Sequence, residues 1–296
     1  MIQLPDFRQK QIFLLNATQL GECVLSLRNE NVLITVDGAT RDKIPVAKLI
    51  AIFIIGDFTV TSKLLQKITR TGVSVYFLKR SCETYASITA YAEGNYLLRQ
   101  RQYALNDTTA LEISRNIVAN KLRNCLALLR GGNIVTIAGK TRMAYKQAMT
   151  QKINSAKDLA SLRGVEGVIS KNYFAAYFAQ IRWYKRVPRG KVDENNILLD
   201  MGYNFLFHFT DAILRVYGFD TYKGIYHQLF FQRKSLACDM MEPFRCIVDR
   251  ALVKMHTLGQ FDPKDFGCRQ GQYYLSYKAS GKYAHIFKFV DRKSVV

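Results

Sequence analysis

Two carboxylates lie three residues apart in the otherwise apolar stretch SLACDMMEPFR, residues 235–245. If this stretch is helical, Asp239 and Glu242 lie on one face, about one turn apart. Carboxylates this close repel each other unless a cation lies between them, and Mg²⁺ or Mn²⁺ would serve because both accept oxygen ligands. An ordinary salt bridge is the simpler arrangement, and the spacing leaves both open. The arginines near enough in sequence to form it are Arg233, Arg245 and Arg250.

A third acid and a histidine extend the possible chemistry. Glu166 lies between two glycines in GVEG, at a predicted helix start, where glycine lets a backbone or a phosphate come close. His227 lies in an aromatic run. Each also has an ordinary interpretation, as a first-turn glutamate favoured by the helix dipole and as a core histidine. Together Glu166, His227 and Glu242 form a carboxylate–imidazole set that suits a divalent metal acting on a phosphodiester.

The charge of the chain indicates the kind of partner. The 43 Lys and Arg residues exceed the 23 Asp and Glu residues, which gives a net charge of +20 and a pI near 9.7. This excess favours a polyanion, and nucleic acid more than an anionic membrane. A merely soluble basic protein is the alternative. The hydrophobic fraction of 49% excludes a disordered tail.

Basic residues gather in the stretch that precedes Glu166, Lys121 among them, and again over 182–191. They predict a surface that follows a DNA backbone without reading its sequence, although a solvated helix face is the alternative for any single residue. Trp183 and Tyr184 either stack on bases or pack in the core. The candidate DNA-binding residues are Arg99, Arg101, Arg130, Lys140, Arg142, Arg163, Arg182, Lys185 and Arg186.

The elements that must position these residues differ between the two parts of the chain. Residues 1–90 contain short β-rich runs broken by turn residues, followed by one helix and a strand, and predict a small, mainly antiparallel β domain. The run LIAIFII, residues 49–55, is too short to cross a bilayer and predicts a buried strand.

Residues 91–296 predict an α-helical domain, so the sequence predicts an α+β protein with a boundary within residues 80–95. Apolar residues recur at helical spacing in one long segment. They are Ile113, Ile117, Leu122, Leu126 and Leu129. A further helix is expected over 235–252, with Ser235 as its N-cap.

Six cysteines are scattered without a CxxC pair, which predicts reduced thiols and a cytoplasmic protein. The opening residues MIQLPDFRQK show no basic region followed by an apolar one, so no secretory signal and no membrane association are expected.

The order of four segments resembles the CRISPR-associated integrase family of spacer acquisition. The segments are NYLLRQRQY (95–103), GVEG (164–167), RGKVDENNILLDMGYNFL (189–206) and GIYHQLFFQRKSLACDMMEPFRCIVDR (224–250). The last segment is the most specific. RVPRGKVDE stands where many members have an Arg-Arg-Pro run. The resemblance implies an N-terminal β domain that dimerises and a C-terminal helical domain that holds the metal.

The resemblance also implies an activity and roles for residues. A metal-dependent transesterification would let the 3′-hydroxyl of a short DNA fragment attack a phosphodiester at a CRISPR repeat. Glu166, His227 and Glu242 would bind Mg²⁺ or Mn²⁺, with Asp239 as a second acid and Arg245 as the basic residue after it. Homodimers would assemble with a small ferredoxin-like adaptation partner on double-stranded DNA. A hydrolytic nuclease for branched or single-stranded DNA and a non-catalytic nucleic-acid-binding scaffold are the alternatives.

Overall fold

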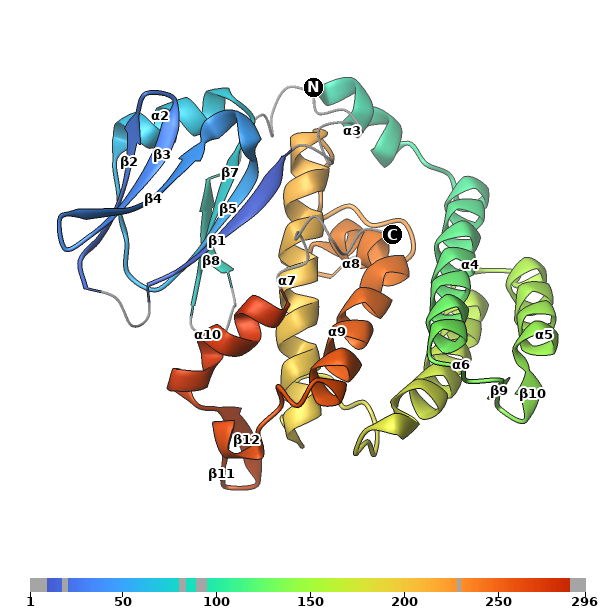
Figure 1. Ribbon diagram of the computed structural model, residues 1–296. Helices are drawn as coiled ribbons and strands as arrows, with labels where there is room; N and C mark the ends of the chain where they lie inside the picture. Colours follow the sequence, from blue (N-terminus) through green and yellow to red (C-terminus); the bar gives the residue numbers. More distant parts are fainter. Residues whose placement is uncertain (1–9, 18–20, 80–83, 89–94, 228–229, 288–296) are drawn as a thin grey trace. The chain divides into compact units, whose positions relative to one another are not determined.

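The computed structural model describes residues 10–17, 21–79, 84–88, 95–227 and 230–287 (Figure 1). Strands dominate the first third of the described chain and helices most of the rest, which confirms the α+β prediction. Two compact units are each built from separate segments. Unit 1 comprises residues 1–100, 208–220 and 277–296, and unit 2 comprises 101–207 and 221–276. The predicted division into domains at residue 90 stays a prediction, and most of its expected boundary lies outside the described residues.

Unit 1 contains two four-stranded sheets. The first has the order β1 (Gln11–Asn16), β5 (Leu49–Ile55), β7 (Ser74–Leu78) and β8 (Thr84–Ile88), and the second β4 (Ala39–Pro45), β3 (Asn31–Val36), β2 (Cys23–Arg28) and β6 (Thr59–Val60). In the first sheet β1, β5 and β7 run parallel, so the pairing is mixed rather than mainly antiparallel. Every residue of β5 is buried, as is typical of a parallel strand covered on both faces.

The core of unit 1 joins both sheets to helix α2 (Ser62–Arg70). Strand β3 alternates buried and half-buried residues, and its Val32 and Ile34 pack with Ile52 and Ile54 of β5 in one cluster. Leu64 and Ile68 form the apolar face of this helix and are fully buried in the same cluster. The predicted buried strand 49–55 is confirmed.

Helix α4 (Asp107–Gly131) is the centre of unit 2. It contacts α5 (Arg142–Ser155), α6 (Leu159–Tyr177), α9 (Arg245–Thr257) and the 3₁₀ turn η3 (Glu242–Phe244). Asn106 caps its start by accepting a hydrogen bond from the Thr109 amide. The predicted apolar positions Ile117, Leu122, Leu126 and Leu129 are buried. Lys121 is buried among them and is the one charged residue in the buried stripe of this helix.

Three predictions about helices are wrong. The expected helix over 235–252 is divided into α8 (Ser235–Met241), η3 and α9, because Pro243 has no amide proton to continue an α-helix. The N-cap of α8 is Lys234 rather than Ser235. Glu166 lies inside α6 rather than at its start, since Asp158 and Ser161 form a capping box that begins the helix earlier.

The remaining helices and strands complete the two units. They are α3 (Tyr96–Tyr103), β9 (Thr136–Ile137), β10 (Lys140–Thr141), η2 (Phe178–Gln180), α7 (Glu194–Val216), η4 (Pro263–Asp265), β11 (Phe266–Arg269), β12 (Gln272–Leu275) and α10 (Tyr277–Ile286), with η1 (Val46–Lys48) in unit 1. Cys23, Cys125, Cys238, Cys246 and Cys268 are free thiols, whereas Cys82 lies outside the described residues. Among the helices of the described chain, none combines the length and apolar character that crossing a bilayer requires.

Candidate functional site

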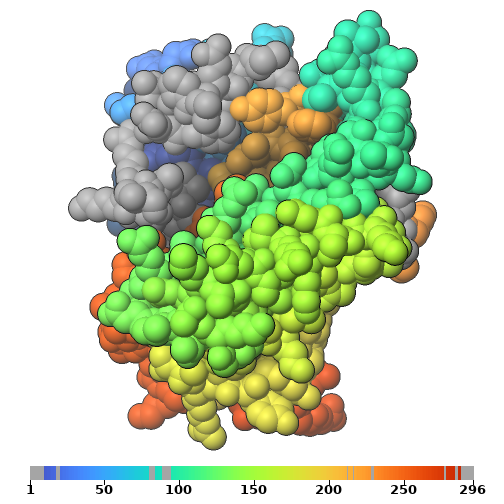
Figure 2. Space-filling view, turned by 90° about the vertical axis from the view of Figure 1, so that its right-hand side faces the viewer, coloured from blue at the N-terminus to red at the C-terminus, as the bar shows by residue number. Residues whose placement is uncertain are grey.

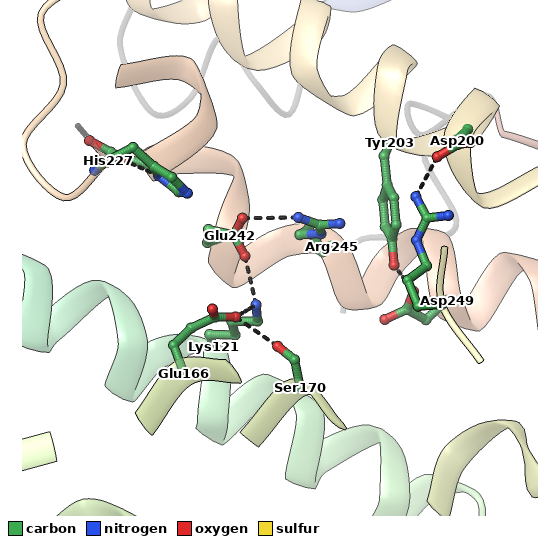
Figure 3. A network of polar contacts seen from close by, with 11 residues as sticks. Lys121, Glu166, Ser170, Asp200, Tyr203, His227, Glu242, Arg245 and Asp249 are labelled. Carbon is green, nitrogen blue, oxygen red and sulfur yellow. Dashed lines mark hydrogen bonds and ion pairs between the residues drawn. The ribbon is translucent and has the colours of Figure 1, made fainter. Parts of the chain in front are cut away.

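Glu166 and Glu242 meet at a single ammonium group. Lys121, from the middle of α4, donates one hydrogen bond to Glu166 Oε1 and another to Glu242 Oε2, the second at 2.7 Å (Figure 3). Glu166 also accepts from the Ser170 hydroxyl at 2.7 Å, one turn further along α6. Glu242 also accepts from Arg245 Nη1 at 3.0 Å. We call Lys121, Glu166, Glu242 and Arg245 the Lys121 cluster.

The Lys121 cluster is buried yet electrically balanced. Burial alone would raise the pKa of the Glu242 carboxyl, but Lys121 and Arg245 outweigh it and lower that pKa to about 2. Burial would lower the pKa of Lys121, but Glu242 and Glu166 outweigh it and raise that pKa. The Lys121 cluster therefore contains two cations and two anions, and Glu242 stays ionised at any physiological pH.

Asp239 points to a different partner from Glu242. Its fully buried carboxylate accepts hydrogen bonds from the amides of Ile225, Tyr226 and His227 at 2.6, 2.9 and 2.9 Å. It also lies 2.6 Å from His227 Nδ1, which therefore carries the proton. The two acids that look paired in the sequence thus serve different groups: Asp239 fixes the 225–227 segment and its histidine.

His227 is oriented in the way that metal-binding histidines are. With Nδ1 bound to a carboxylate, Nε2 presents its lone pair, and it makes no hydrogen bond to any residue that the structure describes. Figure 3 shows the imidazole projecting from its loop toward Glu242. Arg163 of α6 holds the same loop by donating to the Tyr226 carbonyl at 3.2 Å.

Tyr226 leaves a buried hydroxyl without a partner. The side chain is 1% exposed, and its hydroxyl makes no hydrogen bond within the described chain. Burial, then Glu166 and Glu242, raise the pKa of this phenol, so the hydroxyl lies within the field of both glutamates. An orphaned polar atom here indicates that a polar group absent from the structure belongs beside it. Carboxylates, an imidazole nitrogen and a hydroxyl are all types of donor that a hydrated divalent cation accepts.

A second polar network continues from Arg245 into the core. The guanidinium lies 4.1 Å from the ring centre of Tyr203, and the Tyr203 hydroxyl donates to Asp249. Burial raises the pKa of the Asp249 carboxyl to about 6, which the Tyr203 hydrogen bond offsets only in part. Tyr203 and Asp249, which we call the Tyr203 pair, were not among the predicted site residues.

Lys121 is the main correction to the sequence-based site. It was placed on the surface expected to follow DNA, but it is 8% exposed and points inward to two acids. A signal for this was present in the sequence. Lys121 stands four residues after Ile117 and four before Cys125, both buried on the same helix, so the helical period already placed it on the core face.

The predicted DNA-binding residues fall into two groups. Arg99, Arg142, Arg163 and Arg186 are half-buried and donate to groups within the protein, Arg186 to Asp200 and Asn196. The remaining five are exposed: Arg101, Arg130, Lys140, Arg182 and Lys185. Figure 2 shows the surface of helices α4 to α6 in green and yellow-green. Trp183 packs on Phe178, with ring centres 4.6 Å apart, whereas Tyr184 is exposed.

Within the described ranges, no three His, Cys, Asp or Glu side chains are arranged to hold a metal ion. In the structure these side chains have other partners, since Lys121 binds both glutamates and Asp239 binds one nitrogen of His227. The metal-ligand set Glu166, His227 and Glu242 stays a prediction.

Sequence comparison finds a family and relatives that match most of the chain. Residues 19–288 match the family model described as CRISPR associated protein Cas1. A protein of Moorella thermoacetica named CRISPR-associated endonuclease Cas1 1 is 30% identical over 266 residues, which are 84% of this chain and 77% of that protein.

Solved structures with the same fold include two with a TM-score of 0.77. One is a Cas1 protein of Thermotoga maritima, at 19% identity, covering 96% of this chain and 91% of its own. The other is a casposase bound to integration product, at 20% identity, covering 97% and 84%. A Cas6-RT-Cas1–Cas2 complex contains a chain 25% identical to this one, with a TM-score of 0.71, covering 97% of this chain and 32% of its own.

Proposed function

The chain belongs to the CRISPR associated protein Cas1 family, and from this membership we propose that it is a metal-dependent DNA integrase of CRISPR adaptation. The reaction is a transesterification in which the 3′-hydroxyl of a short DNA fragment attacks a phosphodiester of a CRISPR repeat. The curated relative is named an endonuclease, and one structural neighbour is a casposase with integration product. Both names describe phosphodiester chemistry on DNA.

The observation that carries the proposal is the convergence of Glu166 and Glu242 on one cation. They come from α6 and η3, which are far apart in sequence, and both bind the ammonium of Lys121. A point where two carboxylates share a buried positive charge is a point where a metal cation is favourable. His227 supplies a third donor, Nε2, on the side of Glu242.

Glu166, Glu242 and Nε2 of His227 would hold Mg²⁺ or Mn²⁺. Such an ion, when bound, neutralises charge on the phosphoryl oxygens and lowers the pKa of an attacking hydroxyl. The protein prepares the donors for this role. Asp239 keeps the proton of His227 on Nδ1, so that Nε2 is available as a ligand, and Arg245 keeps Glu242 ionised.

The exposed cations would hold the DNA by its phosphates. Arg101, Arg130, Lys140, Arg182 and Lys185 remain the candidates, because their charges face solvent. Arg163 acts at the site instead, since it fixes the loop that carries His227. The partners we propose are double-stranded DNA, a second copy of the chain, and Cas2, which the related complex contains.

The test is strand transfer of a labelled fragment into a repeat-bearing plasmid, with and without Cas2 and EDTA. We expect Glu166→Ala, His227→Ala and Glu242→Ala each to lower joining at least about 100-fold while circular dichroism stays unchanged. Joined product that requires a free 3′-hydroxyl supports integration. Release of fragments alone would support hydrolysis, and salt-dependent binding with no product would indicate a non-catalytic scaffold. Full activity of all three variants would contradict the proposed site.

A further inference from the structure

Lys121 is an unusual residue for its position in α4. It lies in the buried stripe of that helix, between neighbours such as Ile117 and Leu122. A buried lysine is unfavourable unless its charge is matched, and here the matching groups are the proposed metal ligands Glu166 and Glu242 themselves. The ammonium of Lys121 therefore neutralises the same two carboxylates that a divalent metal would neutralise.

The charges of the Lys121 cluster are already balanced. Lys121 and Arg245 carry two positive charges, and Glu166 and Glu242 carry two negative charges. If a divalent ion joined this buried group and nothing moved, two positive charges would stay uncompensated. Arg245 is anchored by the Tyr203 ring beneath it as well as by Glu242. Lys121 has no such second anchor in the part of the chain that the structure describes, where its hydrogen bonds go to the two glutamates.

We propose that Lys121 is a resident counter-cation, which holds the two glutamates together in the metal-free protein and which a divalent cation displaces. The inference rests on the proposed function, because it assigns the metal to Glu166 and Glu242. A lysine suits this exchange better than an arginine, since a compact ammonium on a flexible stem leaves more easily than a fork with two parallel hydrogen bonds. Lys121 thereby keeps the empty site assembled and weakens metal binding.

The experiment measures Mn²⁺ binding to the full chain without DNA or Cas2, by the electron paramagnetic resonance signal of free Mn²⁺. Lys121→Gln keeps a hydrogen-bond donor and removes the charge, and Lys121→Met removes both. We expect each to bind Mn²⁺ about tenfold or more tightly than the wild type, about 1.4 kcal/mol. Arg123→Gln is the matched control, because Arg123 is an exposed cation on the same helix and donates a hydrogen bond to Asn120. Its Mn²⁺ affinity should change less than about twofold, since solvent screens exposed charges.

Thermal unfolding gives a second readout that does not depend on activity. In EDTA, the Lys121 variants should unfold on the order of 10 °C below the wild type, because two buried carboxylates lose their cation. Mn²⁺ should restore most of this difference and should raise the melting temperature of the variants more than that of the wild type. A purely structural lysine would give the first effect but not the tighter metal binding.

The outcomes separate the two proposals. If Glu166→Ala weakens Mn²⁺ binding but Lys121→Gln does not tighten it, the counter-cation is wrong and the metal site stands. If Glu166→Ala leaves Mn²⁺ binding unchanged, the metal lies elsewhere and both proposals are wrong. Lys121→Gln decides the question by itself if Lys121→Met fails to fold, because the amide still donates to a carboxylate.

Discussion

Two carboxylates seven residues apart, Glu242 and Asp249, are both buried and have opposite pKa shifts. Burial is the largest single influence on each and raises both pKa values. Glu242 contacts two cations, Lys121 and Arg245, and ends with a pKa of about 2. Asp249 accepts from the neutral hydroxyl of Tyr203 and ends with a pKa of about 6.

The Lys121 cluster and the Tyr203 pair use buried carboxylates in different ways. In the Lys121 cluster Lys121 and Arg245 keep Glu242 ionised, and both acids share the ammonium of Lys121. In the Tyr203 pair burial raises the pKa of the Asp249 carboxyl to about 6, and the Tyr203 ring packs against the Arg245 guanidinium. The first arrangement prepares charge for a ligand, and the second uses a buried acid to fix a side chain.

Glu242→Gln should give the largest effect. The folded pKa of Glu242, about 2, lies below the ordinary value of 4.5, so its contribution to stability is complete above pH 4.5 and is lost as the pH falls toward 2. The difference corresponds to about 3 kcal/mol. We expect the free energy of unfolding of the variant to be lower than that of the wild type by about this amount at pH 7. Between pH 4.5 and pH 2 the variant should lose less of its free energy of unfolding than the wild type does.

Urea unfolding from pH 7 to pH 2.5 measures this effect. Glu112→Gln, which removes an exposed acid of α4, is the control and should change the unfolding free energy by less than about 0.5 kcal/mol. Parallel pH dependence of wild type and Glu242→Gln would contradict the assignment of a low pKa to this group.

Asp249→Asn should change the free energy of unfolding in the opposite direction to Glu242→Gln. The folded pKa of about 6 lies above the ordinary 3.8, so the stability that Asp249 gives when protonated is present below pH 4 and lost as the pH rises through 6. Asparagine stays neutral and can still accept from Tyr203. We expect the variant to be about 1–2 kcal/mol more stable than the wild type at pH 8 and equal to it near pH 3.5.

Tyr203→Phe tests the Tyr203 pair by changing the donor of its hydrogen bond instead of the acceptor. It removes the donor from the buried carboxylate and should lower the unfolding free energy at pH 8, whereas Asp249→Asn raises it. If both variants destabilised the protein equally at pH 8, the pKa of Asp249 would not be raised in the folded protein.

Gly164→Ala and Gly167→Ala should give the smallest effect and extend the comparison to the surface beside the Lys121 cluster. Both glycines lie inside α6 on its exposed face, and an added Cβ would meet nothing within 4 Å. Alanine should therefore stabilise the helix by about 0.5–1 kcal/mol at each position. If DNA must approach Glu166 closely, strand transfer falls although stability rises. Unchanged strand transfer would show that this face receives no ligand.

The sequence predicted the parts of the fold that local spacing governs. Apolar periodicity placed the buried side of α4, and the run of β-branched residues placed the central strand β5. Prediction from the sequence was less successful for helix boundaries, which single residues such as prolines and caps can move. Pro243 divided an expected helix, and the capping box at Asp158 started α6 early enough to move Glu166 into its interior.

By itself, the sequence determined the α+β class, the core stripes and, through the order of its motifs, the family and the residues worth testing. Only the tertiary structure decided which charges meet. Lys121 lies 45 residues from Glu166 and 121 from Glu242, and packing of α4 against α6 and η3 brings them together. Asp239 likewise meets a loop 12 to 14 residues away rather than the acid three residues on. Spacing along a chain reports which side chains share a face of one element, whereas a charge in the core must find its partner on another element.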